Sequence, residues 1–180
     1  MFEDDHKQPK EVLARGKYLQ LVRQGSWEYA ERLGISGIVG IIPLTDAGEM
    51  VLVEQFRVPL GKRVVELPAG LAGDVLGQEG EPLREAACRE LEEETGYHAR
   101  EMRQVLQGPN SAGSSPHVMT FFLATGLTQV GAGGGDEHED IQVHVVPLAG
   151  IHAWLLAQEA QGKLLDPKIY AGLWFAEHAR

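Results

Sequence analysis

The amino-acid sequence predicts a mixed α/β sandwich with a β-hairpin extension at its N-terminus. Alternating or continuous apolar segments typical of strands lie on both sides of one helical segment, and two further helical patterns close the chain. Short turns rich in Gly, Asp and Pro separate these segments. With 180 residues the chain is long enough for one domain with a sizeable core. Strands, a helix, strands and then helices are expected to pack as layers around that core.

The N-terminal third begins with residues 1–14, which are polar and lack periodicity, so a flexible arm is expected there. Residues 17–23 and 26–32 alternate around a Gln24-Gly25 turn, which predicts a hairpin within residues 15–35. Trp27 in this hairpin is either a core residue or a platform on which a base stacks, and its pattern alone favours the core. Residues 36–180 are expected to form the main domain.

In the main domain, the pattern predicts strands first and helices last. The expected strands are 37–44, 50–57, 64–67, a weaker 103–106, 118–127 and 141–146, and the expected closing helices are 151–161 and 168–179.

One further helix is predicted between Glu81 and Tyr97. Pro82 suits its first turn, and Gly96 suits the left-handed position just past its end. Helical spacing places six residues on one face: Leu83, Ala86, Ala87, Glu90, Leu91 and Glu94.

The carboxylates on this helix require an explanation. Glu90 and Glu94 lie on the packing face and Glu93 is next to both. A solvated acidic face steadied by arginines is the usual interpretation of such a run, but it accounts for Glu92 better than for Glu90 and Glu94. Neighbouring carboxylates repel one another, and their burial is costly unless a cation lies between them. Oxygen ligands without Cys or His favour Mg²⁺, Mn²⁺ or Ca²⁺ over zinc.

Composition excludes several classes of protein. The formal net charge of −10 argues against a nucleic-acid-binding surface. The single Cys88 cannot form an internal disulfide, which fits a cytoplasmic setting. No apolar run is long enough to span a membrane and the N-terminus has no signal-peptide pattern, so no membrane partner is expected. The acidic residues gather in two clusters, Glu90–Glu94 and Asp136–Asp140, which suggests sites that hold cations.

The segment from Glu81 to Tyr97 resembles the Nudix box, whose pattern is G-x5-E-x7-R-E-U-x-E-E-x-G-U with U a bulky apolar residue. The match is complete from Glu81 onward, with Tyr97 as the last U. At its start the pattern expects Gly where the chain has Val75, and the counterpart is Gly70, which implies five additional residues before the helix. The resemblance implies the same fold: a mixed sheet with helices on both faces.

Other segments resemble the ADP-ribose pyrophosphatase branch of that family, which also includes hydrolases of nucleoside diphosphate sugars. These segments are residues 27–32, 54–57, 66–74 and 136–146, and the resemblance covers about residues 17–178. It implies that Mg²⁺, or Mn²⁺, is held by the Ala69 carbonyl, Glu90 and Glu94. It also implies a homodimer in which the hairpin with Trp27 reaches the partner's site. The further implied residues are Arg89 and Glu93 as catalytic residues, with Glu93 adjacent to the metal, Arg57 on a phosphate, Trp27 on the base, and Glu28 and Gly113 as other substrate contacts. His117 is a further candidate contact, and a loop histidine that is only solvated is the plainer interpretation.

Chemistry supports a base outside the helix. A diphosphate is anionic and unreactive, so its hydrolysis needs cations and a group that takes a proton from water. Carboxylates already bound to metal are poor bases, whereas an acid on a mobile Gly-rich loop can close on the substrate. Glu137 and Glu139 meet that description, and acids in an exposed loop are its plainer interpretation.

The loop around residues 111–113 differs in sequence from that of the ADP-ribose pyrophosphatase branch. Where a Ser-Pro-Gly is usual, this chain has Ser111-Ala112-Gly113, which leaves the preferred sugar open. The expected reaction is Mg²⁺-dependent hydrolysis of ADP-ribose or a related nucleoside diphosphate sugar. GDP-mannose and other nucleotide sugars are the alternative substrates, and a non-catalytic Nudix sensor of nucleotide sugars is the alternative class. The intact acids of the helix disfavour the sensor.

Overall fold

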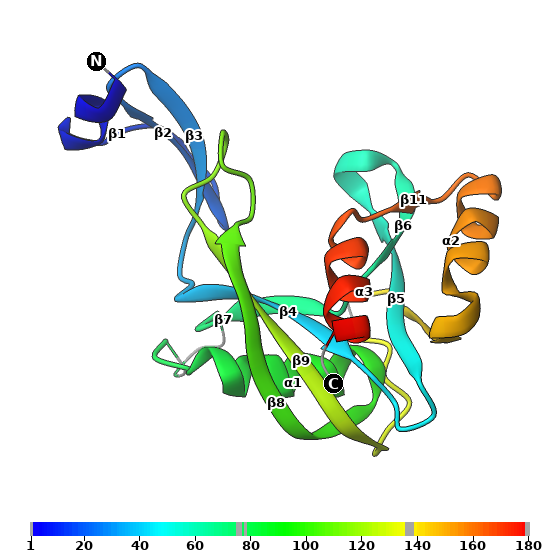
Figure 1. Cartoon of the computed structure of the whole chain (residues 1–180). Helices are drawn as coiled ribbons and strands as arrows, with labels where there is room; N and C mark the ends of the chain where they lie inside the picture. The colour runs from blue at the N-terminus through cyan, green and yellow to red at the C-terminus, as the bar shows by residue number, and fades with distance from the viewer. Residues whose placement is uncertain (1, 75–76, 78, 136–138, 179–180) are drawn as a thin grey trace.

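The computed structural model describes residues 2–74, 77, 79–135 and 139–178, and the described residues form three sheets and three α-helices (Figure 1). The strands are β1 Glu11–Arg15, β2 Leu19–Gln24, β3 Trp27–Arg32, β4 Gly37–Pro43, β5 Glu49–Arg57, β6 Lys62–Glu66, β7 Ala69–Ala72, β8 Tyr97–Pro109, β9 Val118–Gln129, β10 Gln142–Pro147 and β11 Leu164–Leu165. The α-helices are α1 Leu83–Thr95, α2 Ile151–Ala160 and α3 Lys168–His178, and the 3-10 helices are η1 Phe2–Lys7, η2 Val58–Leu60 and η3 Leu148–Gly150.

The sheet at the centre of the molecule has the order β7-β4-β9-β8 and mixes parallel and antiparallel pairs. Strand β4 is parallel to β9 and antiparallel to β7. Both faces of β4 are covered, so its sequence is an almost continuous apolar run. Val39 and Ile41 face the core shared with α1, whereas Ile38 and Ile42 face the core shared with α3.

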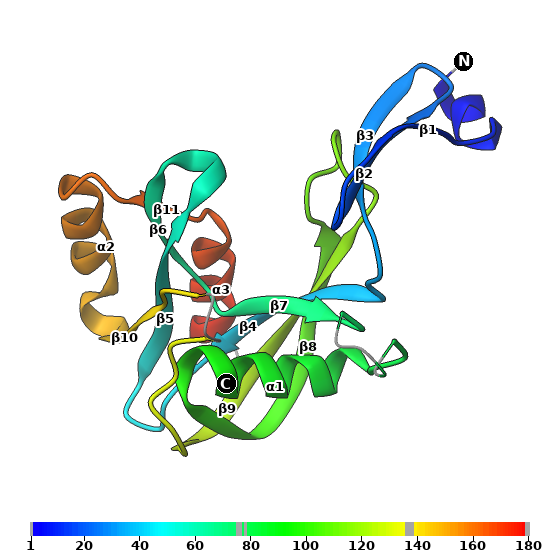
Figure 2. The ribbon, with the colours of Figure 1, turned by 180° about the vertical axis from the view of Figure 1, so that it is seen from behind.

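The second core lies between this sheet, helices α2 and α3, and the sheet β10-β5-β6-β11. Ile169 and Leu173 of α3 and Leu155 of α2 are almost completely buried in it. Helices therefore cover opposite faces of the central sheet, with α1 on one side and α3 on the other (Figures 1 and 2). The predicted mixed α/β sandwich is confirmed.

Helix α1 ends where the sequence predicts. Gly96 adopts the left-handed conformation with φ of 73°, and its N–H donates to the carbonyl of Glu92. At the other end, Pro82 is the residue before the helix rather than a member of its first turn, with an extended ψ of 139°. Its carbonyl accepts the first helical hydrogen bonds, from the N–H groups of Glu85 and Ala86.

The N-terminal segment differs from the expected flexible arm. Residues 11–15 form strand β1, which pairs with β2 and makes the predicted hairpin a three-stranded sheet. Helix η1 precedes it, and the Asp5 carboxylate accepts a hydrogen bond from the Ser26 N–H at 3.1 Å. This pairing depends on partners distant in sequence, which periodicity within residues 1–14 does not reveal. The hairpin turn is Gly25-Ser26, one residue later than expected, because Gln24 pairs with Trp27.

The N-terminal sheet projects away from helix α1 and lies beside the loop that joins β8 to β9 (Figures 1 and 2). The Ala30 N–H donates to the Ser114 carbonyl at 2.9 Å, which ties the sheet to that loop.

Three other strands differ from the expectation. Strand β8 spans thirteen residues instead of the predicted 103–106, because β9 supplies a partner along its whole length. Strands β7 and β11 were not predicted, since they are short and contain small or repeated apolar residues without alternation. Among the described residues, no helix is both long and apolar enough to cross a membrane.

Candidate active site

Helix α1 and strand β7 bring the two carboxylates on the packing face of α1 against the backbone of residues 69–71. The Ala69 N–H donates to Oε2 of Glu94 at 3.1 Å, and the Leu71 N–H donates to Oε1 of Glu90 at 3.3 Å. Gly70 lies between these contacts, where an added Cβ would come within 1.9 Å of the Glu90 Cδ. A larger residue at position 70 would require the Glu90 side chain to move.

Both carboxylates are held in an environment that disfavours their charge. Only 3% of Glu94 is exposed, and this burial raises its pKa to about 9 despite the hydrogen bond from Ala69. Burial also raises the pKa of Glu90 to about 7, although the positive charge of Arg89 opposes the change. The negative charges of Glu90 and Glu139 raise the pKa of Glu94 further, which shows that Glu139 lies within electrostatic range of Glu94. A divalent cation beside these acids would stabilise the ionised forms that the protein alone does not.

Arg89 joins the acids of this region to one another. Its Nε and Nη2 donate to the two carboxylate oxygens of Glu81 at 3.0 and 3.1 Å, and its Nη1 donates to Glu90 and Glu93 at 3.0 Å each. The second Nη2 contact, also 3.0 Å, is to the Leu71 carbonyl. Because these partners occupy its donors, Arg89 orients Glu90 and fastens α1 to β7.

The acids open onto a cavity of about 510 Å³. Its charged lining contains four basic and seven acidic side chains: Arg32, Arg57, Arg89, Lys168, Glu66, Asp74, Glu90, Glu93, Glu94, Glu139 and Asp166. An anionic substrate would be repelled by this excess of acid unless cations entered with it. Arg57 donates from Nε to Oε2 of Glu66 at 2.7 Å, and this contact holds its guanidinium at the edge of the cavity.

The Gly-rich segment after β9 is docked on the end of α1. The N–H groups of Gly134 and Gly135 donate to the carbonyls of Glu94 and Glu93 at 2.9 and 3.0 Å, which satisfies carbonyls that the helix leaves unpaired. Gly133 has φ of 66°, and an added Cβ there would lie 2.4 Å from the Thr95 carbonyl carbon. Residues 133–135 of the predicted mobile Gly-rich loop are therefore docked on helix α1, and the glycines permit this close approach.

The loop acids predicted as candidate bases are placed only in part. Glu139 lines the cavity together with Glu90 and Glu94. Glu137 lies outside the described residues, as do Asp136 and His138.

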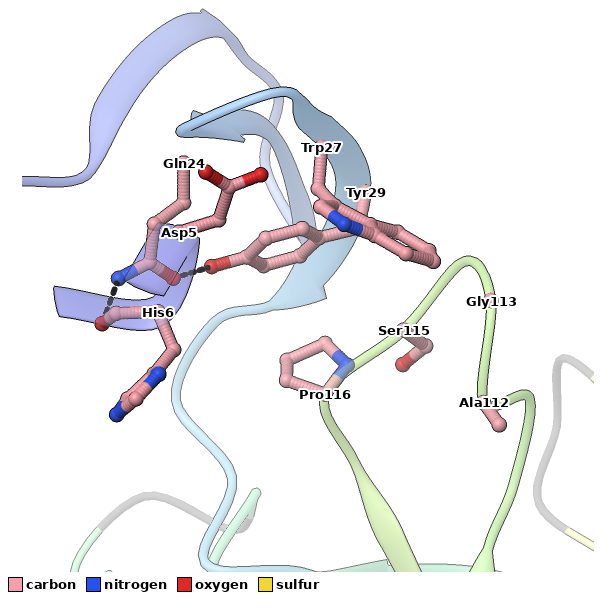
Figure 3. A pocket seen from close by; sticks show the side chains of 9 residues that line it. All are labelled: Asp5, His6, Gln24, Trp27, Tyr29, Ala112, Gly113, Ser115 and Pro116. Atoms are coloured by element: carbon pink, nitrogen blue, oxygen red, sulfur yellow. Dashed lines mark hydrogen bonds between the residues drawn. The ribbon is translucent and has the colours of Figure 1, made fainter. Parts of the chain in front are cut away.

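A second cavity, of about 330 Å³, surrounds Trp27 (Figure 3). It lies between η1, the hairpin β2–β3 and the β8–β9 loop, and Gly113 is part of its wall. Figure 3 shows the Trp27 and Pro116 rings on opposite sides of the opening, with the Tyr29 ring beside that of Trp27. The Trp27 side chain remains 47% exposed, so the interpretation of Trp27 as hairpin core does not hold. None of the residues around this cavity lines the acidic one.

Two predicted substrate contacts lie outside both cavities. Glu28 is exposed on β3 and accepts hydrogen bonds from Nε and Nη2 of Arg23 at 3.1 and 2.8 Å. His117 accepts the Arg32 N–H at its Nε2, at 2.8 Å, and burial lowers the pKa of the imidazole. A neutral His117 that accepts at Nε2 fastens the base of the N-terminal sheet to the β8–β9 loop. This contact gives His117 a structural role, and its contact with substrate stays a prediction.

The predicted metal ligands form a mixed set. Across the part of the chain that the structure describes, no three side chains of His, Cys, Asp or Glu are grouped so as to hold one ion. Glu90 and Glu94 supply two carboxylates, and the third predicted ligand is the backbone carbonyl of Ala69 rather than a side chain. Two carboxylates with raised pKa values beside a backbone strand fit a hard divalent cation.

Comparison with known proteins identifies the family. The family described as NUDIX domain matches residues 36–167, which is most of the chain. The chain belongs to the Nudix family. Two relatives are the methanol dehydrogenase activator of Bacillus methanolicus, 38% identical over 108 residues, and the ADP-ribose pyrophosphatase of Bacillus subtilis, 34% identical over 125 residues. The matches cover 59% and 66% of this chain, and 56% and 65% of those relatives.

A solved structure supports the Nudix fold. The crystal structure of an ADP compounds hydrolase superposes with a TM-score of 0.70 at 21% identity, covering 94% of this chain and 90% of that one. At this identity the likeness concerns the fold alone.

Five charged residues around the acidic cavity were not predicted as parts of the site: Arg32, Glu66, Asp74, Asp166 and Lys168. Lys168 comes from the start of α3, Arg32 from the end of β3, and the largely buried Glu66 from β6. Burial raises the pKa of Glu66 against the influence of Arg57. Lys168 and Arg32 carry no local motif, and only the tertiary structure brings them together. Glu66 could have been found from the sequence, since it precedes Leu67-Pro68-Ala69-Gly70 in one of the segments that resemble the family.

Proposed function

We propose that the protein hydrolyses the diphosphate linkage of ADP-ribose or a related nucleoside diphosphate sugar, in a reaction that depends on Mg²⁺. The observation that carries this proposal is a pair of carboxylates, the buried Glu94 and the largely buried Glu90, that line an acidic cavity together with Arg57. Membership of the Nudix family and the name of the Bacillus subtilis relative, an ADP-ribose pyrophosphatase, support it. Water adds to one phosphorus and the bridging P–O bond breaks, which gives AMP and ribose 5-phosphate.

In this proposal Glu90, Glu94 and the Ala69 carbonyl hold the cation. When bound, Mg²⁺ or Mn²⁺ would neutralise the phosphate oxygens and make a bound water more acidic. The protein's own residues prepare that site, since Arg89 orients Glu90 and the Ala69 N–H orients Glu94. Glu93, which is exposed and bonded to the same Arg89, lies at the rim of the cavity.

The remaining roles belong to residues around the cavity. Arg57 contacts a phosphate, because its planar guanidinium can donate two parallel hydrogen bonds to phosphate oxygens. Glu139 takes the proton of the attacking water, because it lines the cavity without being one of the proposed ligands. Glu137 stays the alternative base from the sequence. These assignments use residues from β5, α1 and the β9–β10 connection, so they depend on the whole fold.

The decisive experiment is a panel of nucleotide sugars with product identification in ¹⁸O-labelled water, with and without Mg²⁺. We expect ADP-ribose to give AMP and ribose 5-phosphate only with the cation, and the label identifies the phosphorus that is attacked. A panel without turnover of any member would contradict the proposal.

A second substrate class within the same reaction follows from the β8–β9 loop. Ala112 replaces the proline usual in the ADP-ribose branch, and Ala112 and Gly113 both line the Trp27 cavity. GDP-mannose or another nucleotide sugar would then be the better substrate, and its kcat/KM in the same panel decides between the two. A Nudix sensor without turnover is the alternative class; the first relative bears the name of an activator rather than an enzyme.

We also propose that the active form is a homodimer. The Trp27 cavity and the acidic cavity share no lining residue, so Trp27 would reach substrate only at another subunit's site. Strand β2 exposes Leu19 and Leu21, and the turn before it exposes Tyr18; a second copy would cover this apolar surface. Light scattering coupled to gel filtration tests this, and a monomeric mass at the concentration where the protein is active would contradict it.

A further inference from the structure

The loop acid Glu139 is followed by a residue with an unusual pair of contacts. Arg63, on β6, donates from Nη1 to Oδ2 of Asp140 at 2.8 Å and from Nη2 to the Asp140 carbonyl at 3.3 Å. It therefore holds both the side chain and the backbone of Asp140. The third donor, Nε, contacts Oε1 of Glu54 at 2.6 Å. One guanidinium thus joins the residue after Glu139 to the interior of the β5–β6 sheet.

The interior end of this contact is rigidly built. Only 1% of Glu54 is exposed, and its second oxygen is bonded to Nζ of Lys163 at 2.8 Å and to Nε2 of His144 at 2.9 Å. Lys163 in turn donates to the Gln158 amide oxygen at 2.7 Å. These residues come from β5, β10, α2 and the segment before β11, so Arg63 has little freedom to move.

The outer end of the contact is different. The Asp140 side chain is 76% exposed, and an ion pair with one exposed partner adds little to stability. Stability therefore does not explain why Arg63 reaches across to the β9–β10 connection. The position of Asp140 does explain it, since Asp140 is the neighbour of Glu139, and Glu139 lines the acidic cavity.

The other side of the same connection is also fixed. Gly134 and Gly135 bond to the carbonyls of Glu94 and Glu93 at the end of α1. Both anchors are thus attached to elements that build the cavity: α1 before Glu139, and the β5–β6 sheet after it.

We propose that Arg63 is a positioning residue that holds Asp140, and through it Glu139, at the acidic cavity. The inference rests on the proposed function, in which Glu139 takes the proton of the attacking water. Arg63 itself does not touch the substrate. Lys could not replace it, because an ammonium lacks the planar fork that contacts Glu54 and Asp140 together.

The test uses Asp140→Asn, which keeps the shape of the residue and leaves the buried Glu54 untouched. Asp46→Asn, at the exposed β4–β5 turn, is the matched control that also removes one surface carboxylate. We expect Asp140→Asn to lower kcat about tenfold with an unchanged KM, since small displacements of a reacting group are costly. Its melting temperature should equal that of the control, and Asp140→Glu should recover most of the activity. An equal kcat for Asp140→Asn and Asp46→Asn would overturn the inference.

A double variant separates positioning from a general structural effect. Glu139→Gln alone should lower kcat about 10²-fold or more. Adding Asp140→Asn to Glu139→Gln should lower kcat by less than a further twofold, because the contact between Arg63 and Asp140 acts through Glu139. Fully multiplicative losses would show that Asp140 acts independently of Glu139, which contradicts the proposal. Arg63→Lys should have the same effect as Asp140→Asn, both in the parent protein and in Glu139→Gln. A wild-type kcat for Arg63→Lys would argue against the positioning role of Arg63.

Hydrogen exchange makes the result independent of the substrate. Peptides covering residues 139–142 should exchange at least fivefold faster in Asp140→Asn than in Asp46→Asn. Equal exchange overturns the anchoring whatever the activity. Faster exchange together with a wild-type protein that turns over no nucleotide sugar would remove the proposed function and leave the anchor in place, so the two failures are distinguishable.

Discussion

Glu94 and Glu54 are both almost completely buried carboxylates, yet the protein treats them in opposite ways. Burial raises the pKa of Glu94 to about 9, because its nearest direct partner is a backbone N–H and its charged neighbours include other acids. Burial also acts to raise the pKa of Glu54, but hydrogen bonds from Lys163, His144 and Arg63 outweigh it and bring the pKa to about 2.

The comparison separates an incomplete site from a complete one. Around Glu54 the protein supplies the cations itself, as is usual for a buried charge. Around Glu94 the cation has to come from outside, which is the property expected of a metal ligand. A count of buried acids would not distinguish the two, whereas the charge of their partners does.

The largest expected effect is that of Glu94→Gln. Loss of a ligand charge at constant volume should lower kcat about 10³-fold, since a metal contributes several kcal/mol to the transition state. Glu92→Gln is the matched control on the same helix, because Glu92 contacts His98 on the exposed side. Turnover of nucleotide sugar in saturating Mg²⁺ measures both, and equal rates would remove the metal role from Glu94.

Without metal, Glu94→Gln should make the stability of the protein less dependent on pH. Since the pKa of Glu94 is raised in the folded state, its contribution is complete below pH 4.5 and is lost as the pH rises toward 9. In EDTA the melting temperature of the parent should therefore fall across this range more than that of Glu94→Gln. A melting temperature that falls more steeply with pH in Glu94→Gln than in the parent would contradict the raised pKa of Glu94.

Glu54→Gln should cost about 3 kcal/mol of stability at pH 7, because it leaves three cationic or donor groups around a buried neutral amide. The depressed pKa predicts that this stability is present above pH 4.5 and is lost as the pH falls toward 2. The difference in unfolding free energy between parent and variant should thus narrow in acid. Chemical denaturation at pH 7 and pH 3 measures it, and a constant difference would argue against the charged network.

Gly70→Ala tests whether the geometry around the acids matters as much as their charge. The new methyl group would overlap the Glu90 carboxyl, so we expect a loss in kcat of about 10²-fold and of about 1–3 kcal/mol in stability. Gly108→Ala is the control, since a Cβ at this strand glycine has no neighbour within 4 Å among the described residues. Equal kcat values and equal unfolding free energies for Gly70→Ala and Gly108→Ala would show that β7 can shift away from Glu90 without loss.

The smallest effect is expected for Trp27→Ala, which removes a binding contact remote from both acids. Stacking on a base is worth about 1–3 kcal/mol and is felt equally before and in the transition state, so KM should rise about tenfold with little change in kcat. Trp174→Ala, which removes an exposed tryptophan of α3 that lines neither cavity, is the control. Steady-state kinetics decide, and a lower kcat at unchanged KM would contradict base stacking.

Much of the central fold could be predicted from sequence because its signals are local. The apolar run of β4, Gly96 after α1 and the acids on the packing face of α1 each follow from a few neighbouring residues. Strand β1 could not be predicted, since its order depends on pairing with β2.

The site divides in the same way. Helical spacing gathers Glu90 and Glu94, but Arg63, Arg32 and Lys168 acquire their roles only from distant segments. The glycines before Glu139 show what composition leaves out: it suggested a mobile loop, whereas the fold packs Gly133 against the end of α1.

The anomalous scattering of Mn²⁺ soaked into crystals would reveal whether Glu90 and Glu94 bind a divalent cation. We predict a peak in contact with the carboxylates of Glu90 and Glu94, and no peak at Glu54, whose cations are already in place. An anomalous map without a peak at Glu90 and Glu94, in crystals of protein that is active with Mn²⁺, would contradict the account.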